Sequence, residues 1–166
     1  MFYDPGSFTF TAPLESHWSC IYQEYQNIEE HLVDWVEREL YGEGWRVYPL
    51  FQFPGGEPIA EHVSRCPLTA ALVREHFPRH GAAGFSVLRP QTRIQPHQGF
   101  QGNSLRCHLG LRVPAGDCAL TVNDMTRQWQ NGKVLVFDDR FWHEAWNLTP
   151  EDRVILLVDF VPDSHL

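Results

Sequence analysis

The chain has 166 residues, a formal net charge of −8 and 43% hydrophobic residues. This length suits one domain with a buried core. The acidic balance argues against nucleic acid as a partner, because phosphate binding needs a basic face. No apolar run approaches the roughly 20 residues of a membrane span, and the first residues show no signal-peptide pattern. We therefore expect a soluble, cytoplasmic protein with no membrane and no nucleic-acid partner.

The cysteine content points to the same compartment. The chain has four cysteines and no C-x-x-C pair, so neither a zinc knuckle nor a redox motif is indicated. Reduced thiols are the norm in the cytoplasm. The spacing leaves one disulfide open.

The first half of the chain predicts two helices and one strand. Residues 1–24 are rich in Pro, Thr and aromatics and suggest an edge strand or a draped arm. A helix is expected over 27–40, with Asn27 as its N-cap and an apolar stripe at three- to four-residue spacing. Residues 45–53 predict a strand near a sheet edge, because Pro49 cannot donate to a ladder. A second helix follows Ser64 and ends before Pro78.

From Gly84 the apolar period changes to two. Strands are expected near 84–89, 92–97, 104–113, 117–123, 127–129, 133–138, 141–146 and 153–160. Asn131-Gly132 is a strong two-residue hairpin signal. Eight short strands with Gly/Pro turns are typical of a double-stranded β-helix, or jelly roll. We expect a single domain over 1–166, mainly β, with helical support over about 1–80 and a jelly-roll core over about 84–162.

Two histidines at predicted strand ends are candidate metal ligands. His97 precedes Gln98-Gly99, and His143 lies in an aromatic run. Non-haem iron sites usually combine two imidazoles with a carboxylate two residues after the first histidine. That carboxylate position is Gly99 here, with Asp124 and Asp139 as possible remote carboxylates. A side chain at 99 would share a strand face with His97, so Gly99→Asp is expected to tighten iron binding unless a remote aspartate already completes the site. Alternatively, both histidines are ordinary strand and turn residues.

Three further residues are candidates for binding a small carboxylate. Arg153 opens an apolar strand, and an arginine facing a core is costly unless it is paired. Arg106 and His108 lie two apart and therefore share one face of a strand, opposite Leu105 and Cys107. A guanidinium fork suits a carboxylate through two parallel hydrogen bonds. Exposed polar positions on an outer sheet remain the alternative for all three.

Five motifs in order resemble the aspartyl/asparaginyl β-hydroxylases, which are iron(II)- and 2-oxoglutarate-dependent dioxygenases with a jelly-roll domain. They are Pro96-His97-x-Gly99, Leu105-Arg106-x-His108-Leu-Gly-Leu111-x-x-Pro114, Trp129-x-x-Gly132-Lys-Val-Leu-x-Phe-Asp-Asp139, Phe141-x-His143-Glu-x-Trp146 and Arg153-x-Ile-x-x-Val-Asp159. A weaker match around Ser86 extends the likeness to about residues 45–166.

This resemblance implies a role for each candidate residue. By position, the iron(II) ligands fall on His97 and His143, and the 2-oxoglutarate contacts fall on Ser86, Arg106, His108 and Arg153. Gly99 agrees with the resemblance, because the family lacks the usual carboxylate and has a two-histidine site completed by water. The implied reaction uses O2 and 2-oxoglutarate, releases succinate and CO2, and hydroxylates the β-carbon of an aspartyl or asparaginyl group.

The resemblance leaves the substrate open as a free amino acid, a carrier-bound amino acid or a peptide bearing Asp or Asn. Arg89, Arg93 and Arg140 are candidates, by sequence position alone, for pairing with its carboxylates. Two alternatives remain at this stage. One is a halogenase, since a site without a carboxylate leaves a coordination position for chloride. The other is a non-catalytic jelly-roll binding module that has kept its histidines.

Overall fold

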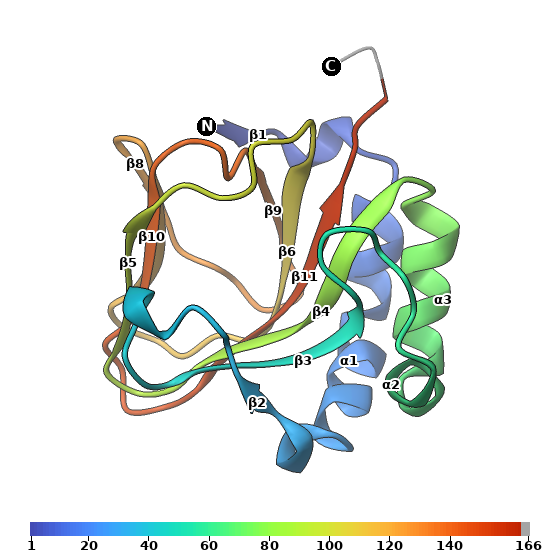
Figure 1. Ribbon diagram of the computed structural model, residues 1–166, viewed down its shortest axis with the longest axis horizontal. Coiled ribbons are helices and arrows are strands. Elements are labelled where there is room, and N and C mark those ends of the chain that lie inside the picture. Colours follow the sequence, from blue (N-terminus) through green and yellow to red (C-terminus); the bar gives the residue numbers. More distant parts are fainter. Residues whose placement is uncertain (164–166) are drawn as a thin grey trace.

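The computed structural model describes residues 1–163 and consists of two β-sheets with helices packed on one side (Figure 1). The larger sheet has the strand order β1-β9-β6-β11-β4-β3-β2, and the smaller has the order β5-β10-β7-β8. The larger sheet comprises β1 (Phe2–Tyr3), β2 (Val33–Asp34), β3 (Trp45–Phe51), β4 (His80–Leu88), β6 (Leu105–Arg112), β9 (Val134–Phe137) and β11 (Arg153–Phe160). The smaller sheet comprises β5 (Thr92–His97), β7 (Cys118–Val122), β8 (Met125–Arg127) and β10 (His143–Asn147). This is the predicted jelly-roll class.

The predicted strands of the second half form, except that the one expected at 127–129 lies at Met125–Arg127 as β8. Most of these strands have two faces with different surroundings, and β11 is an example. In β11, Val154, Leu156 and Val158 face the helices, whereas Ile155 belongs to the core between the sheets. Arg153 and Asp159 share the parity of Ile155 and therefore face the space between the sheets. The strand that packs against the helices on one side thus carries polar groups toward the sandwich interior on the other.

The helices cover the outer face of the larger sheet. They are α1 (Thr11–Gln26), α2 (Ala60–Arg65) and α3 (Pro67–His76), with short 3-10 turns η1 (Pro5–Ser7), η2 (Glu29–His31) and η3 (Arg38–Leu40). Leu14, Ile21 and Tyr25 form the buried stripe of α1. Figure 1 shows α1 and α3 beside the larger sheet and away from the smaller one. Within residues 1–163, no helix is long and apolar enough to cross a membrane.

Two expectations for the first half were wrong. Residues 11–26 form a helix and not an arm, since Pro13 lies in the first turn, where a missing N–H costs little. Residues 27–40 do not form a helix, and Asn27 is the C-cap of α1 instead of an N-cap. Trp35, part of the apolar stripe that suggested a helix, stacks instead on Trp45 of β3, with 5.1 Å between the ring centroids.

The Asn131-Gly132 hairpin was also wrong. This turn leads from β8 in the smaller sheet to β9 in the larger one, so the flanking strands are not paired. Asn131 Oδ1 accepts a hydrogen bond from Val113 N at 2.7 Å, which anchors the crossing turn near the end of β6. The tight hairpin lies instead between β7 and β8, at Asn123 with φ 52°.

The strand at Pro49 was confirmed, and so was the second helix, which is α3; the preceding helix α2 was not predicted. β3 is covered on its outer side only by the two residues of β2, so Pro49 needs no donor there. All four cysteines are free, which settles the open question of a disulfide.

Candidate active site

His97 and His143 are brought together by strand pairing. They are directly opposite each other at the end of β5 and the start of β10. Their ring centroids lie 4.2 Å apart. One metal ion between the two rings is therefore compatible with the register of the smaller sheet.

The hydrogen bonds of both imidazoles leave one nitrogen of each available. His97 Nδ1 lies 2.8 Å from the carbonyl oxygen of Gln95, and His143 Nδ1 lies 2.9 Å from that of Phe141. A carbonyl only accepts, so each Nδ1 carries the proton and each Nε2 keeps its lone pair. Burial, opposed by the hydrogen bond to Phe141 and reinforced by the nearby His97, lowers the pKa of His143 to about 3. His143 is therefore a neutral ligand at neutral pH.

The space beside Gly99 is occupied by Asp139. A Cβ at position 99 would lie 2.1 Å from Asp139 Oδ2. Arg106 holds that carboxylate through Nη2 at 3.1 Å, while its Nε and Nη2 donate to Asp159 at 2.7 and 2.9 Å. Within residues 1–163, no group of three His, Cys, Asp or Glu residues is arranged to hold a metal ion. Asp139 thus lies at the site but is engaged by Arg106.

A buried cationic cluster lies between the two sheets, and Phe137 lies between its His108 and His143, with ring centroids 4.9 and 6.0 Å away. Arg153 is 2% exposed, and its guanidinium stacks 4.5 Å from the ring centroid of Trp129. Its Nη2 donates to Ser86 Oγ at 3.3 Å, and Ser86 Oγ also accepts from Trp45 Nε1 at 3.0 Å. Among the described residues no carboxylate lies within 4.0 Å of Arg153, and its Nε has no partner. Burial lowers the pKa of Arg153 to about 10, so the guanidinium remains charged.

His108 adds a second unused donor. Its Nδ1 accepts from Trp129 Nε1 at 3.2 Å. Because an indole only donates, the neutral His108 ring carries its proton on Nε2. That nitrogen is buried and has no partner among the described residues. Burial, followed by the charges of Arg153 and Arg106, holds the pKa of His108 well below its usual value. The pocket therefore offers an anion one full charge and two unsatisfied donors.

The structure gathers the six sequence-predicted site residues around the space between the two sheets, in two groups with Arg106 apart from both. His97 and His143 form the first. Ser86, His108 and Arg153 form the second. Arg106 lies by Asp139 and Asp159, with two of its donors already used.

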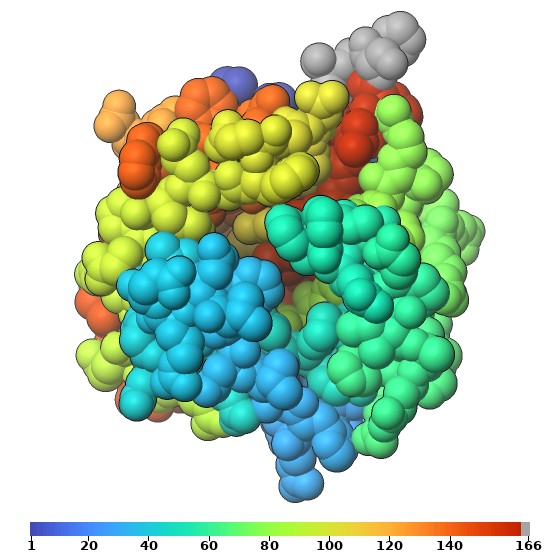
Figure 2. Space-filling view, viewed as in Figure 1, coloured from blue at the N-terminus to red at the C-terminus, as the bar shows by residue number. Residues whose placement is uncertain are grey.

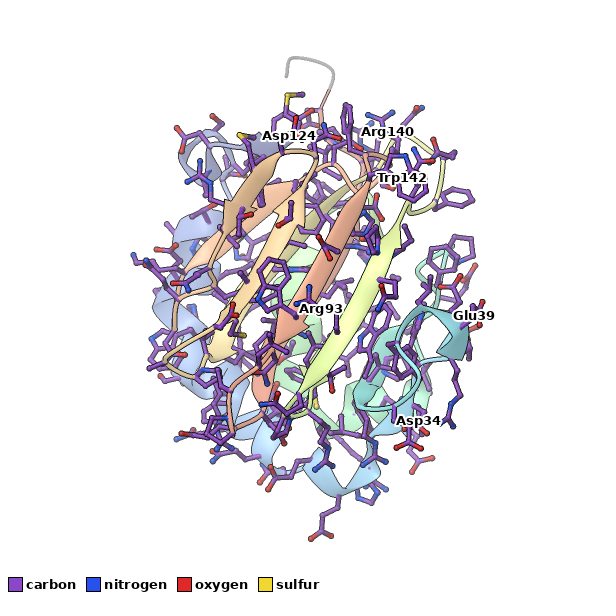
Figure 3. All side chains as sticks on the ribbon, turned by 90° about the vertical axis from the view of Figure 1, so that its left-hand side faces the viewer. Asp34, Glu39, Arg93, Asp124, Arg140 and Trp142 are labelled. Carbon is purple, nitrogen blue, oxygen red and sulfur yellow. The ribbon has the colours of Figure 1, made fainter. Side chains whose placement is uncertain are left out.

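The cations suggested for substrate carboxylates are all engaged elsewhere. Arg93 lies over Trp146 at 5.1 Å and 3.4 Å from Glu144. Arg140 donates to both oxygens of Asp138. Arg89 lies 3.9 Å from Asp152. Asp124 is at the exposed β7–β8 turn (Figure 3). All three arginines are ion-paired, and their contact with substrate carboxylates stays a prediction. Among residues 1–163, Asp124 does not join the two histidines in a three-residue metal-binding group.

Sequence reasoning missed the two tryptophans that shape the pocket. Trp45 was assigned only to a strand, and Trp129 only to a strand and a motif. No local signal shows that Trp45 reaches Ser86, because 41 residues separate them. The contact between Arg106 and Asp159 could have been predicted, since both residues lie in matched motifs.

Comparison with known proteins decides the family. Residues 15–162 match the sequence profile described as aspartyl/asparaginyl beta-hydroxylase. The chain belongs to the aspartyl/asparaginyl β-hydroxylase family. The ornithine lipid ester-linked acyl 2-hydroxylase of Rhizobium tropici is 33% identical over 96% of this chain and 59% of its own length. The human aspartyl/asparaginyl beta-hydroxylase is 40% identical over 69% of this chain and 15% of its own. This family member therefore spans only part of the length of those relatives.

A solved structure supports the same fold. A Pseudomonas putida prolyl-4-hydroxylase superposes with a TM-score of 0.58 and 12% identity, over 90% of this chain and 88% of that chain. At this identity the likeness concerns the fold alone. The jelly roll of this β-hydroxylase family member is thus shared with that prolyl-4-hydroxylase.

Proposed function

We propose that the chain is an iron(II)- and 2-oxoglutarate-dependent hydroxylase. The observation that carries this proposal is the combination of two available imidazole Nε2 atoms with a buried arginine that has no carboxylate partner and lies between the same two sheets. Imidazole suits iron, and an unpaired buried guanidinium suits the distal carboxylate of a small diacid. When bound, iron and 2-oxoglutarate supply the oxidation of an unactivated C–H bond by O2, with succinate and CO2 as coproducts.

In this proposal the residues of the chain bind, orient and exclude water. The backbone carbonyls of Gln95 and Phe141 fix the tautomers of His97 and His143, so each Nε2 is ready to bind the metal. Arg153 and His108 hold the cosubstrate through donors that have no other partner. Trp129 orients both, because it stacks on Arg153 and donates to His108. The proton on His108 Nε2 stays in place as a hydrogen-bond donor.

The proposal has two possible target groups. The family name supports the β-carbon of an aspartyl or asparaginyl group. The Rhizobium relative, whose alignment covers almost the whole chain, supports carbon 2 of an acyl chain. The halogenase alternative has less support, since the Asp139 carboxylate fills the space beside Gly99 and is an unfavourable neighbour for chloride.

Cosubstrate consumption tests the proposal. The purified chain with iron(II), ascorbate and O2 should convert 2-oxoglutarate to succinate, and His97→Ala and His143→Ala should abolish the conversion. A non-catalytic binding module would release no succinate above the metal-free control under any substrate condition.

A further inference from the structure

The candidate site is reached through a hollow at one end of the barrel. Figure 2 shows this hollow between residues 33–44 in blue, 52–57 in teal and 98–103 in yellow, with β6 and β11 visible inside. His97, at the end of β5, comes directly before the last of these segments, whereas Arg153 is buried at the start of β11. A diacid that is bound to a metal on the histidines and to Arg153 therefore has to extend along the strands into the barrel.

Strand pairing shows how far apart these two binding positions are. The inward-facing residues of β10 are His143, Ala145 and Asn147, because every second side chain points to the same face. Asn147 Nδ2 donates to the carbonyl oxygen of Leu88 at 2.9 Å, and Leu88 is paired with Arg153 in the larger sheet. Asn147 and Arg153 thus lie at the same level of the two sheets. His143 lies four residues away from that level, or about 13 Å along the strand.

One row of inward-facing side chains lies between the histidines and the level of Arg153, and we call it the middle row. In the smaller sheet it consists of Ala145 and its paired neighbours, Ile94 of β5 and Leu120 of β7. A register shift between β5 and β10 allows Ile94 and His97 to face the same side, although three residues separate them. The histidines and the middle row therefore form successive levels of one inner wall.

The larger sheet contributes Ile155 to the middle row. Ile155 is two residues from Arg153 on β11 and is paired with Ser86 on β4. It belongs to the same buried cluster as the three middle-row residues of the smaller sheet. A chain that joins the two histidines to Arg153 has to pass between Ala145 and Ile155.

The two side chains that flank this passage differ in size. Ala145 has the shortest side chain of the four apolar residues in the middle row, so it leaves room beside Ile94 and Leu120. Ile155 limits that room from the opposite sheet. Protein interiors are packed so closely that a change of one methylene is felt. The pair is therefore placed to sense how long and how branched a bound diacid is.

We propose that Ala145 and Ile155 are specificity-determining residues for the cosubstrate, which fit the unbranched chain of 2-oxoglutarate and exclude a diacid one methylene longer. The inference rests on the proposed function, because it concerns the cosubstrate of the same site. A longer diacid offers the same 2-oxo acid to the metal and the same carboxylate to Arg153, so the contacts at its two ends do not distinguish it. Its extra methylene has to be placed between Ala145 and Ile155. A closely packed site discriminates one methylene by about 10- to 200-fold.

Calorimetric titration of the full chain loaded with Mn(II) under argon tests the inference, with 2-oxoglutarate and 2-oxoadipate as the probes. The unchanged chain should bind 2-oxoglutarate at least about tenfold more tightly than 2-oxoadipate. Ile155→Ala opens the passage and should bring the two affinities to within about threefold of each other. Ala145→Leu closes it and should weaken 2-oxoglutarate about 10- to 100-fold, the effect of overpacking a closely packed space. Its Mn(II) affinity should stay the same, since neither histidine is changed.

A double variant and a matched control separate fit from general damage. Ala145→Leu combined with Ile155→Ala should recover most of the lost 2-oxoglutarate affinity, because the two side chains share one space, whereas independent sites would give additive losses. Val158→Ala removes apolar volume from the same strand, but Val158 faces the helices. It should leave the ratio of the two affinities unchanged.

The results separate this inference from the proposed function. Ile155→Ala with an undiminished preference for 2-oxoglutarate, or Ala145→Leu with unchanged 2-oxoglutarate affinity, would overturn the inference while binding of 2-oxoglutarate to the unchanged chain left the proposed function standing. Equal losses of Mn(II) and 2-oxoglutarate affinity in Ala145→Leu would also count against it. If Ala145→Leu does not fold, the affinity ratio of Ile155→Ala decides alone. Failure of 2-oxoglutarate to bind to the unchanged chain would overturn the proposed function itself.

Discussion

Replacing Arg153 with methionine should have opposite effects on folding and on cosubstrate binding. Burial lowers the pKa of Arg153 to about 10. Set against the ordinary value of 12.5, this shift corresponds to about 3 kcal/mol of destabilisation, present at neutral pH because both values lie above it. Loss of the cation–π contact between Arg153 and Trp129 removes about 1–2 kcal/mol of stability and partly offsets that gain. We expect Arg153→Met to stabilise the ligand-free chain by about 1–2 kcal/mol, on those two terms.

Cosubstrate binding should change in the other direction. The methionine has no donor, so 2-oxoglutarate should no longer stabilise the chain at all. Arg153→Lys keeps the charge but loses the planar fork, which should weaken 2-oxoglutarate by about 1.5–3 kcal/mol, or roughly 10- to 150-fold in Kd.

Urea unfolding with and without 2-oxoglutarate and Mn(II) measures both effects. Arg74→Met is the matched control, because Arg74 also lies over an aromatic ring without a carboxylate partner but on the surface. It should change neither quantity appreciably. A destabilised Arg153→Met chain that 2-oxoglutarate still stabilises would refute the assignment of Arg153 to the carboxylate.

Three further predictions concern the metal site. His97→Ala and His143→Ala should each abolish Mn(II) binding in calorimetry at a folding cost of about 2 kcal/mol or less; retained binding would place the metal elsewhere. Gly99→Asp should weaken metal binding and lower Tm, because its Cβ would collide with Asp139, whereas Asp139→Asn should keep the metal; a metal-free Asp139→Asn chain would contradict the two-histidine site. Stability of the metal-free chain should fall as the pH drops from about 6.5 toward 3, since the pKa values of His143 and His108 are lowered in the folded state and protonation therefore favours unfolding; His143→Asn should reduce this loss in urea titrations.

The strands of the second half could be predicted because each has two different faces. In β11 one face packs on the helices and the other meets the sandwich interior, so residues 154–158 are all apolar and the polar Arg153 and Asp159 lie near the two ends of the strand. The same logic fails for residues 27–40. There the apolar spacing resembles a helix, but Trp35 packs on Trp45 while Ile28 and Leu32 join the core under α1. Tertiary contacts override the helix-like spacing of residues 27–40, and those contacts cannot be read from this stretch of sequence alone.

The site residues likewise divide into those that the sequence identifies and those whose contacts depend on the fold. His97 and His143 stood out through their place in ordered motifs, and strand register then set them opposite each other. The engagement of Asp139 by Arg106, and the two tryptophans around Ser86 and Arg153, depend on contacts between residues far apart in the sequence, most of them on strands of the larger sheet. The expected effect of Gly99→Asp on metal binding is reversed for that reason. The space beside Gly99 is filled by Asp139, which lies 40 residues further along the chain.

Anomalous diffraction from crystals grown with Mn(II) and 2-oxoglutarate tests the central claim most directly. We predict a single strong manganese peak bonded to the Nε2 atoms of His97 and His143, with the distal carboxylate of 2-oxoglutarate against Arg153. A manganese peak away from the two histidines, or 2-oxoglutarate bound away from Arg153, would contradict the account.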